Sequence, residues 1–280
     1  MTAHLSLWAA VLLGVVEGLT EFLPVSSTGH LTIVSKLLGY DIADPAITGF
    51  TAVIQVGAII AVIIYFFADI KRLFLAWIRG LARPALRSDP DYRMAWLVIV
   101  GSLPIVVVGF LARHVVSGPL RSLWVVAIAL IVWGAVMLVS EVVARQNRVE
   151  AELTWTDTLL IGFAQCLALI PGVSRSGATI SVGLMRGLDR VAATRLAFLL
   201  GIPALLGAGV FELPAALGGG VGLLPTLIGT VVSFVVAYAT VAWLLKFVAH
   251  HKITAFVWYR WVVGAALIVA LATGAITAVG

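Results

Sequence analysis

The sequence is short of charge and almost lacks cysteine. Only 11% of its 280 residues are charged and 62% are apolar, whereas a soluble domain averages about 25% charged and 45–50% apolar residues. A soluble protein of this size would have too few charged side chains to cover its surface. The single cysteine, Cys166, excludes an intramolecular disulfide and a CxxC metal site. No His or Cys spacing resembles a zinc site. The composition therefore indicates an integral membrane protein.

Six apolar stretches are long enough to cross a bilayer as helices, which takes about 20 residues each. They cover residues 45–68, 94–112, 122–140, 191–211, 226–245 and 261–280. We therefore expect an all-α integral membrane protein with six transmembrane helices, forming a single membrane domain over residues 1–280.

Two further apolar stretches, residues 5–38 and 158–187, are each interrupted by a polar turn. The first turn is Pro24-Val-Ser-Ser-Thr-Gly29 and the second is Pro171-Gly-Val-Ser-Arg-Ser-Gly177. Irregular backbone at membrane depth is tolerated only where protein or a wet cavity surrounds it, and broken segments of this kind mark binding sites. We predict that each stretch forms a re-entrant helix–turn–helix hairpin.

The two hairpins resemble each other at a fixed offset of 148 residues. This offset pairs identical residues: Gly14 with Gly162, Val25 with Val173, Ser26 with Ser174, Gly29 with Gly177, Phe50 with Phe198, and Ile54 with Ile202. Each hairpin is followed by three spans, and an odd number of crossings turns the second copy upside down. The sequence therefore predicts an inverted-topology repeat made of residues 1–141 and 154–280.

The basic residues predict the orientation, because Lys and Arg collect in cytoplasmic loops. If the basic stretch 70–93 is a cytoplasmic loop, alternation places most of the 18 Lys and Arg residues on that side, Arg260 included. The residues left on the outer side are Lys36, Arg113 and Arg121. The net charge of +5 thus reports topology and does not indicate a nucleic-acid partner. The two hairpins then enter from opposite faces, so their tips can meet near the midplane.

The first hairpin carries carboxylates, hydroxyls and an imidazole. Glu17 and Glu21 are four residues apart, so they share one face of a helix. A carboxylate at membrane depth is costly and indicates a functional site; the alternative is a pair of water-exposed carboxylates at a helix end. The run Ser26-Ser-Thr28 either caps the next helix or contributes to an anion site at its N-terminus. His30 either titrates near neutrality or simply bonds a carbonyl.

The second hairpin places Arg175 between two serines at the start of a helix. A guanidinium there suits bidentate capture of a phosphate. The alternative is an ion pair between Arg175 and Glu17 or Glu21 across the repeat interface, which would not exclude phosphate binding. The candidate substrate-binding residues are Arg175, Ser174, Ser176, Thr28, Thr179, Gly172 and Gly177. Together the two tips suit phosphoryl transfer.

The stretch Gly14-Val-Val-Glu-Gly-Leu-Thr-Glu-Phe-Leu-Pro-Val-Ser-Ser-Thr-Gly-His30, with Pro171-Gly-Val-Ser-Arg-Ser-Gly-Ala-Thr179, closely resembles the bacterial undecaprenyl-diphosphate phosphatase family, also known for bacitracin resistance. The likeness covers the whole chain in length and segment order. It implies a multi-pass enzyme of the bacterial inner membrane whose site opens to the outer, periplasmic face. Its reaction would convert undecaprenyl diphosphate to undecaprenyl phosphate and phosphate, recycling the lipid carrier for peptidoglycan synthesis. It also implies dependence on Mg²⁺ or Ca²⁺, with Glu17 and Glu21 as candidate ligands.

The expected mechanism divides the work between the two hairpins. Arg175 and helix N-terminal amides hold the terminal phosphate, and Ser27 attacks in line to give a phosphoseryl intermediate. Ser26 and a water molecule are the alternative nucleophiles. Glu21 is the base or, with Glu17, a metal ligand, while His30 protonates the leaving group or activates the hydrolytic water. The polyprenyl tail would lie between apolar helices that are open to membrane lipid.

A polyprenyl-phosphate flippase or other secondary transporter is the rival hypothesis, because such carriers also use inverted repeats with broken helices. A carrier needs no nucleophile, so phosphate release by the pure protein separates the two. A non-catalytic scaffold would leave the charges of both hairpins without a role. The sequence leaves the number of assembled chains open, a homodimer included.

Overall fold

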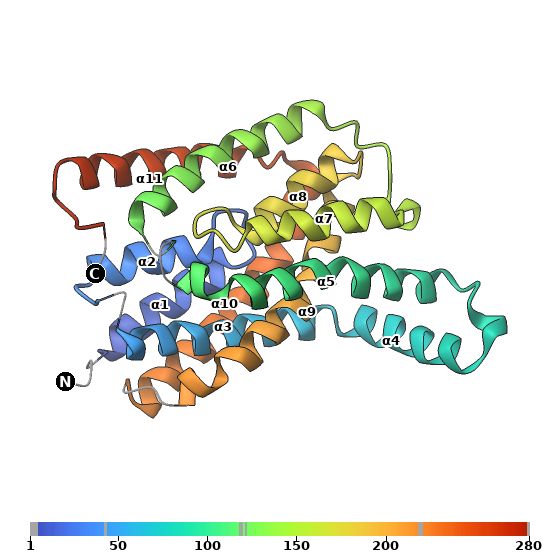
Figure 1. The fold of residues 1–280 in the computed structure, drawn as a ribbon, viewed down its shortest axis with the longest axis horizontal. Coiled ribbons are helices and arrows are strands. Elements are labelled where there is room, and N and C mark those ends of the chain that lie inside the picture. Colours follow the sequence, from blue (N-terminus) through green and yellow to red (C-terminus); the bar gives the residue numbers. More distant parts are fainter. Residues whose placement is uncertain (1–4, 42–43, 118–119, 121, 218–220, 279–280) are drawn as a thin grey trace.

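The computed structural model describes residues 5–41, 44–117, 120, 122–217 and 221–278, and within these ranges it contains helices and no strand. The predicted all-α class is confirmed (Figure 1). The helices are α1 (Leu7–Thr20), α2 (Ser27–Leu37), α3 (Pro45–Tyr65), α4 (Phe67–Ala82), α5 (Pro90–Ser117), α6 (Leu123–Val143), α7 (Trp155–Leu167), α8 (Arg175–Met185), α9 (Arg190–Leu217), α10 (Leu223–His250) and α11 (Thr254–Ala272), with 3₁₀ turns at Pro84–Leu86 and Glu150–Glu152.

Among the described residues, six helices are long and apolar enough to cross a membrane, as predicted. These are Pro45–Tyr65, Pro90–Ala112, Leu123–Val143, Arg190–Gly207, Leu223–His250 and Thr254–Ala272. The last span begins at Thr254 and not at residue 261, so it includes Arg260. Arg121 and the predicted end of this span at residues 279–280 lie outside the described residues.

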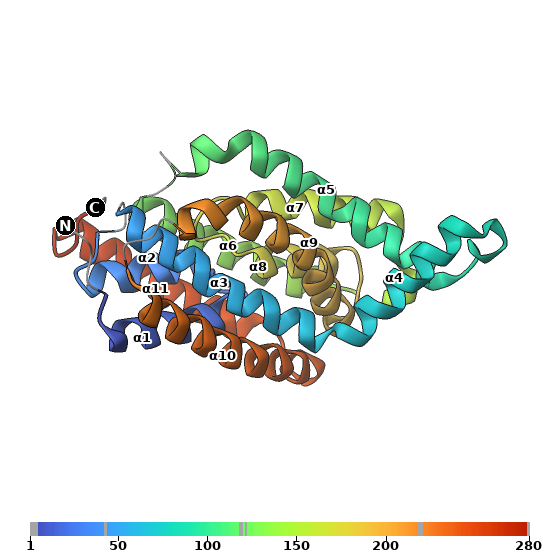
Figure 2. The ribbon, with the colours of Figure 1, turned by 90° about the horizontal axis from the view of Figure 1, so that it is seen from below.

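The stretch 70–93, predicted as a loop, is mostly helical. It contains most of α4, the turn Pro84–Leu86 and the first residues of α5. Figures 1 and 2 show that α4 and the adjoining end of α5 extend beyond the other helices. The stretch still connects two candidate spans, and it is helical because charge alone does not prevent a helix. The apolar residues of α4 lie strongly on one side, so α4 is an amphipathic helix.

Each predicted hairpin is a pair of short helices joined by a turn. In the first, α1 is followed by α2, and in the second, α7 is followed by α8, with α7 beginning at Trp155 rather than at residue 158. Both turns end on a serine with a φ of 77°, Ser26 and Ser174. Each serine Oγ accepts a hydrogen bond from the backbone N–H three residues later, at 3.4 Å from Gly29 and 3.2 Å from Gly177. The capping serines thus start α2 and α8 in the same way.

Close helix packing holds the first hairpin in place. Along α1, Gly14 and Gly18 face α10 so closely that an added Cβ would lie 2.6 Å from the carbonyl oxygen of Gly229 and 2.7 Å from that of Ser233. Small residues of this kind allow two membrane helices to approach. The remaining packing is regular: α7 lies against α5, α3 against α9 and α10, and α6 against α11. Since α1 carries both glutamates, its tight seat on α10 fixes their position.

The buried carboxylate of Asp157 links the start of α7 to the end of α8 in the second hairpin. Asp157, near the start of α7, pairs with Arg148 at 2.6 Å and with Arg186, just after α8, at 2.7 Å. Burial alone would raise the pKa of Asp157, but hydrogen bonds from Arg148, Thr154 and Arg186 hold this pKa well below its usual value. The two ends of the hairpin are therefore tied together by charge.

Candidate active site

The two hairpin turns touch each other. The Gly172 N–H donates to the Ser26 Oγ at 3.1 Å, and the Ser176 hydroxyl donates to the carbonyl of Leu23 at 3.0 Å. Two motifs almost 150 residues apart in the chain are thereby joined into one site. Neither contact could be read from the sequence, although the tips were expected to meet.

At this junction, three predicted site residues form one chain of hydrogen bonds. The Ser27 hydroxyl donates to Glu21 Oε2 at 2.5 Å, and Arg175 Nη2 donates to Glu21 Oε1 at 2.7 Å. Arg175 also donates from Nη1 to the carbonyl of Gly201 at 3.2 Å. Ser27 and Glu21 are both buried. The ion pair between hairpins, one of two alternatives for Arg175, is therefore present, and the same carboxylate is positioned to accept the proton of Ser27.

Ser27 and Arg175 are the first residues of α2 and α8, so both lie where backbone N–H groups have no partner within their helix. The partial positive charge of two helix N-termini thus converges on the junction. Such termini bind phosphate readily. The local geometry therefore favours an anion beside Ser27.

Most of the other predicted binding residues hold the second turn together. Ser174 and Ser176 have their hydroxyl oxygens 3.1 Å apart, and the Thr179 hydroxyl donates to the carbonyl of Arg175 at 2.8 Å. Gly172 has a φ of 100°, and a Cβ there would lie 2.6 Å from the carbonyl oxygen of Val126. Gly177 supplies the N–H that Ser174 caps. These side chains shape the turn that presents Arg175.

His30 is held from two sides. Its Nδ1 lies 2.8 Å from the carbonyl oxygen of Ser26, and its Nε2 lies 2.8 Å from the hydroxyl of Tyr259 on α11. The two rings are stacked, with centroids 5.5 Å apart. Both ring nitrogens are therefore engaged away from Ser27, and the structure places His30 next to the nucleophile candidates without a direct bond to Ser27.

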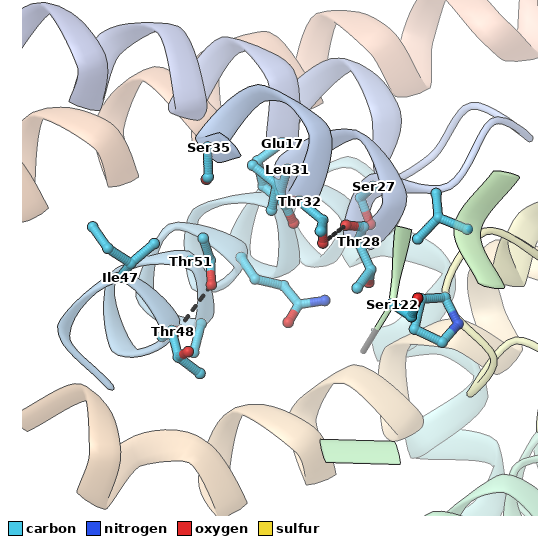
Figure 3. Close-up of a pocket in the computed structure, with 14 residues that line it drawn as sticks. Glu17, Ser27, Thr28, Leu31, Thr32, Ser35, Ile47, Thr48, Thr51 and Ser122 are labelled. Carbon is cyan, nitrogen blue, oxygen red and sulfur yellow. Dashed lines mark hydrogen bonds between the residues drawn. The ribbon is translucent and has the colours of Figure 1, made fainter. Parts of the chain in front are cut away.

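A cavity of about 150 Å³ opens beside Ser27 (Figure 3). Glu17, only 1% exposed, lies on its wall with Ser27 and Thr28. Further neutral polar side chains on the wall come from α2, α3 and the N-cap of α6: Thr32, Ser35, Thr48, Thr51, Gln55 and Ser122. The remaining lining residues are Leu31, Ile47, Ala52, Val126 and Pro171. The cavity is thus rich in hydroxyl groups, and among the described residues no Lys or Arg lines it.

The oxygen atoms of this cavity set limits on a metal site. Among the described residues, no group of three His, Cys, Asp or Glu side chains could hold a metal ion. Both oxygens of Glu21 are engaged by Ser27 and Arg175. Glu17 stands on the wall among hydroxyl and amide oxygens, which are hard donors of the kind that Mg²⁺ and Ca²⁺ prefer.

Arg260 was predicted on the cytoplasmic side, and that prediction was wrong. Its side chain is fully buried between the two turns. It donates to the carbonyl of Pro24 in the first turn at 3.0 Å and to that of Gly172 in the second at 2.7 Å. It also reaches the α6 carbonyls of Leu130 and Ala129, at 3.2 and 3.3 Å. Because these carbonyls satisfy the guanidinium, the charge is tolerated inside a span.

The sequence reasoning thus missed several polar residues inside spans. Thr51 and Gln55 were passed over although they are one turn apart in an otherwise apolar helix, which is a sign of a polar face. Tyr259 and Arg260 directly precede the charge-free window that predicts the last span, so neither was predicted at the site. Thr51 and Gln55 lie inside a predicted span and carry this signal in the sequence, whereas Tyr259 and Arg260 come just before the predicted start of the last span.

Residues 10–266 match the family described as bacitracin resistance protein BacA, and the chain therefore belongs to this family. It is also similar to curated proteins over nearly its full length. It is 55% identical to undecaprenyl-diphosphatase 3 of Frankia casuarinae over 272 residues, 96% of this chain and 98% of the relative. It is 56% identical to undecaprenyl-diphosphatase 1 of Frankia alni over 275 residues, 98% and 99% of the two chains. It is 53% identical to undecaprenyl-diphosphatase of Cutibacterium acnes over 279 residues, 96% and 98% of the two chains.

Proposed function

We propose that the protein is a membrane phosphatase that hydrolyses undecaprenyl diphosphate to undecaprenyl phosphate and phosphate. The names of its relatives supply the substrate. The single structural observation that carries the chemistry is the chain of contacts Ser27–Glu21–Arg175, in which a hydroxyl, a base and a cation meet at two helix N-termini. The membership in a bacitracin resistance family agrees with a role in recycling the lipid carrier of peptidoglycan synthesis.

In this mechanism Ser27 is the nucleophile. Its Oγ attacks the terminal phosphorus while its proton passes to Glu21 Oε2, the atom it already contacts. The bond from that phosphorus to the bridging oxygen breaks, and the lipid monophosphate leaves. Water then attacks the phosphoserine, the P–Oγ bond breaks, and the proton held by Glu21 returns to Ser27. Ser26 is the weaker candidate, because its Oγ accepts from both Gly29 and Gly172 and so shapes the turn.

Arg175 and the N-terminal amides of α2 and α8 stabilise the negative charge that spreads over the equatorial oxygens. Arg175 is positioned for this by its bonds to Glu21 and Gly201. His30 carries the remaining proton transfer, to the leaving group or from the hydrolytic water. The hydroxyl-lined cavity beside Ser27 receives the diphosphate.

A divalent cation, Mg²⁺ or Ca²⁺, fits the wall formed by Glu17 and the neighbouring hydroxyl and amide oxygens. Glu17 would hold it, together with phosphate oxygens, and Glu21 is the second candidate ligand. When bound, the ion would neutralise charge on the diphosphate.

The arrangement in the membrane is proposed to be an inverted repeat of residues 1–141 and 154–280 with two re-entrant hairpins. The packing of α1 on α10 and of α7 on α5 supports it, since the first helix of each hairpin lies against the second span of the other half. With the basic segment around α4 in the cytoplasm, the first residues of α3 and α6 lie on the outer side. Both helix starts contribute to the cavity, which supports an active site open to the periplasmic face of the inner membrane. One chain supplies both turns, and a homodimer remains a proposal.

The test is phosphate release from undecaprenyl diphosphate by the pure protein in detergent micelles. Wild type should release phosphate, Ser27→Ala should release almost none, and Ser26→Ala should keep a measurable rate. With a label on the terminal phosphate, acid quenching should trap labelled protein in wild type and not in Ser27→Ala. A wild-type protein that moves the lipid between leaflets of a vesicle but releases no phosphate would instead be the transporter.

A further inference from the structure

The contact between His30 and Tyr259 links the first hairpin to the last helix of the chain. His30 is buried, while Tyr259 is 45% exposed on the surface of α11. A tyrosine hydroxyl in an apolar environment needs a hydrogen-bond partner, and here the partner is the one histidine of the candidate site. Figure 1 shows α11 running beside α6, with α2 nearby.

The partners of the imidazole determine where its proton lies. A backbone carbonyl only accepts, so Nδ1 of neutral His30 donates to Ser26 and carries the proton. Nε2 is then an acceptor, and the Tyr259 hydroxyl donates to it at 2.8 Å. When His30 becomes protonated, the tyrosine hydroxyl can rotate and accept instead. The contact therefore fits both protonation states of a residue that transfers protons.

Arg260, the residue after Tyr259, anchors this part of α11 to both turns. Arg260 is bonded to the carbonyls of Pro24 and Gly172, one in each turn. Because Arg260 bonds both turns, the backbone of α11 at Tyr259 is held close to the first hairpin, where the tyrosine hydroxyl meets His30. Helix α11 thus positions the hydroxyl that contacts His30 in the first hairpin.

The second hairpin provides a natural comparison. The 148-residue offset pairs His30 with Ala178, which belongs to an apolar cluster with Val173 and Trp133. His30 therefore contacts a tyrosine hydroxyl, whereas Ala178, its counterpart in the second hairpin, packs among apolar side chains.

We propose that Tyr259 is a positioning residue that holds the His30 ring in place through Nε2, while the Ser26 carbonyl keeps the proton on Nδ1, for proton transfer during hydrolysis. This inference rests on the proposed phosphatase function. Tyr259 acts through His30, whereas Ser27, Glu21 and Arg175 have their hydrogen bonds with one another and with Gly201.

The experiment compares wild type with Tyr259→Phe, which removes only the hydroxyl. Histidine labelled with ¹⁵N in the resting protein reports the tautomer, and a His30→Gln sample identifies the His30 signals among the 5 histidines. Wild type should show Nδ1 protonated and Nε2 bare, and Tyr259→Phe should shift the Nε2 signal. In phosphate release, Tyr259→Phe should lower kcat about three- to tenfold with little change in KM, the effect expected from one lost neutral hydrogen bond.

Tyr238→Phe is the matched control, because Tyr238 is also a partly exposed tyrosine on a span and packs edge-on against Tyr65. It should leave both the His30 signals and kcat unchanged. Tyr259→Phe with unaltered His30 signals, or with altered signals and a wild-type kcat, would overturn the proposal. A wild-type protein without phosphatase activity would refute the proposed function instead, and the His30 signals would then still decide whether the Tyr259 hydroxyl holds Nε2 of His30.

Discussion

The two hairpin turns have the same backbone and different chemistry. Ser26 and Ser174 share a φ of 77° and cap the following helix through the same kind of bond. At the 148-residue offset, however, Glu17 becomes Gln165, Glu21 becomes Leu169, Ser27 becomes Arg175 and His30 becomes Ala178. One backbone design therefore supplies a nucleophile with its acid–base groups in one copy and a phosphate-binding cation in the other.

This difference separates the role of the backbone in each turn from the role of the side chains that follow it. A strained serine cap produces a helix N-terminus aimed at the junction, whichever residues follow it. The side chains after the cap then decide whether the terminus carries a proton-transfer group or a charge. Because the turns are bonded to each other, neither half of the chemistry is complete without the other.

The largest effect is expected from removing the base of the first turn. Glu21→Gln keeps the shape but cannot take the proton of Ser27, so kcat should fall by about 10²–10⁴-fold. Leu169→Gln changes the corresponding position of the second turn and should keep most of the wild-type rate. Phosphate release under saturating substrate measures both. If Glu21→Gln retained more than a tenth of wild-type kcat, the division of labour between the turns would be wrong.

The next largest effect concerns the residue that the two turns share. Arg260→Met leaves the buried carbonyls of Pro24 and Gly172 without their donors, at about 1–3 kcal/mol for each unpaired group. Thermal unfolding in detergent should show a clearly lower Tm, together with a loss of activity. Lys252→Met removes an exposed positive charge and serves as the control. Equal Tm values for the two variants would show that Arg260 does not hold the turns together.

The sequence predicted much of this architecture because its signals are local. Long apolar stretches, most of them free of charge, identified the six spans, and polar turns that begin with proline identified the breaks within both hairpins. The position of Arg260 was predicted wrongly because a charge inside a span is tolerated only where carbonyls from distant segments surround it. Which distant segments lie beside a residue cannot be predicted from the local sequence. The same reason explains why the Glu21–Arg175 pair remained one of two alternatives until the structure placed the turns side by side.

A third comparison separates charge from geometry at the second turn. Arg175→Lys keeps the positive charge but loses the planar fork that grips two phosphate oxygens. The loss of one charge-assisted hydrogen bond should cost about 1.5–3 kcal/mol, or roughly ten- to a hundredfold in rate. Arg175→Ala should be only slightly worse. A lysine variant within twofold of wild-type turnover would refute the role of Arg175 as a clamp.

The smallest expected effect distinguishes the spans that follow the two hairpins. On α3, Thr48, Thr51 and Gln55 line the cavity, whereas the offset places Leu196, Leu199 and Pro203 at the corresponding positions of α9. The first half therefore has a polar wall where the second has apolar packing. This wall is neutral, so its members contribute ordinary hydrogen bonds to the diphosphate rather than charge attraction.

Gln55→Leu should accordingly raise KM for the lipid diphosphate about three- to tenfold while kcat changes little, because one neutral hydrogen bond to the bound substrate is lost before and during the reaction alike. Thr51→Val should act in the same direction. Thr240→Val is the matched control: its hydroxyl also donates to a carbonyl of its own helix, at 2.8 Å from that of Val236, but it lies on α10 and away from the cavity wall. Steady-state phosphate release over a range of substrate concentrations separates the two parameters. If both cavity variants had the KM of Thr240→Val, the diphosphate would have to bind without the α3 wall, and the polar difference between α3 and α9 would play no part in recognising the substrate.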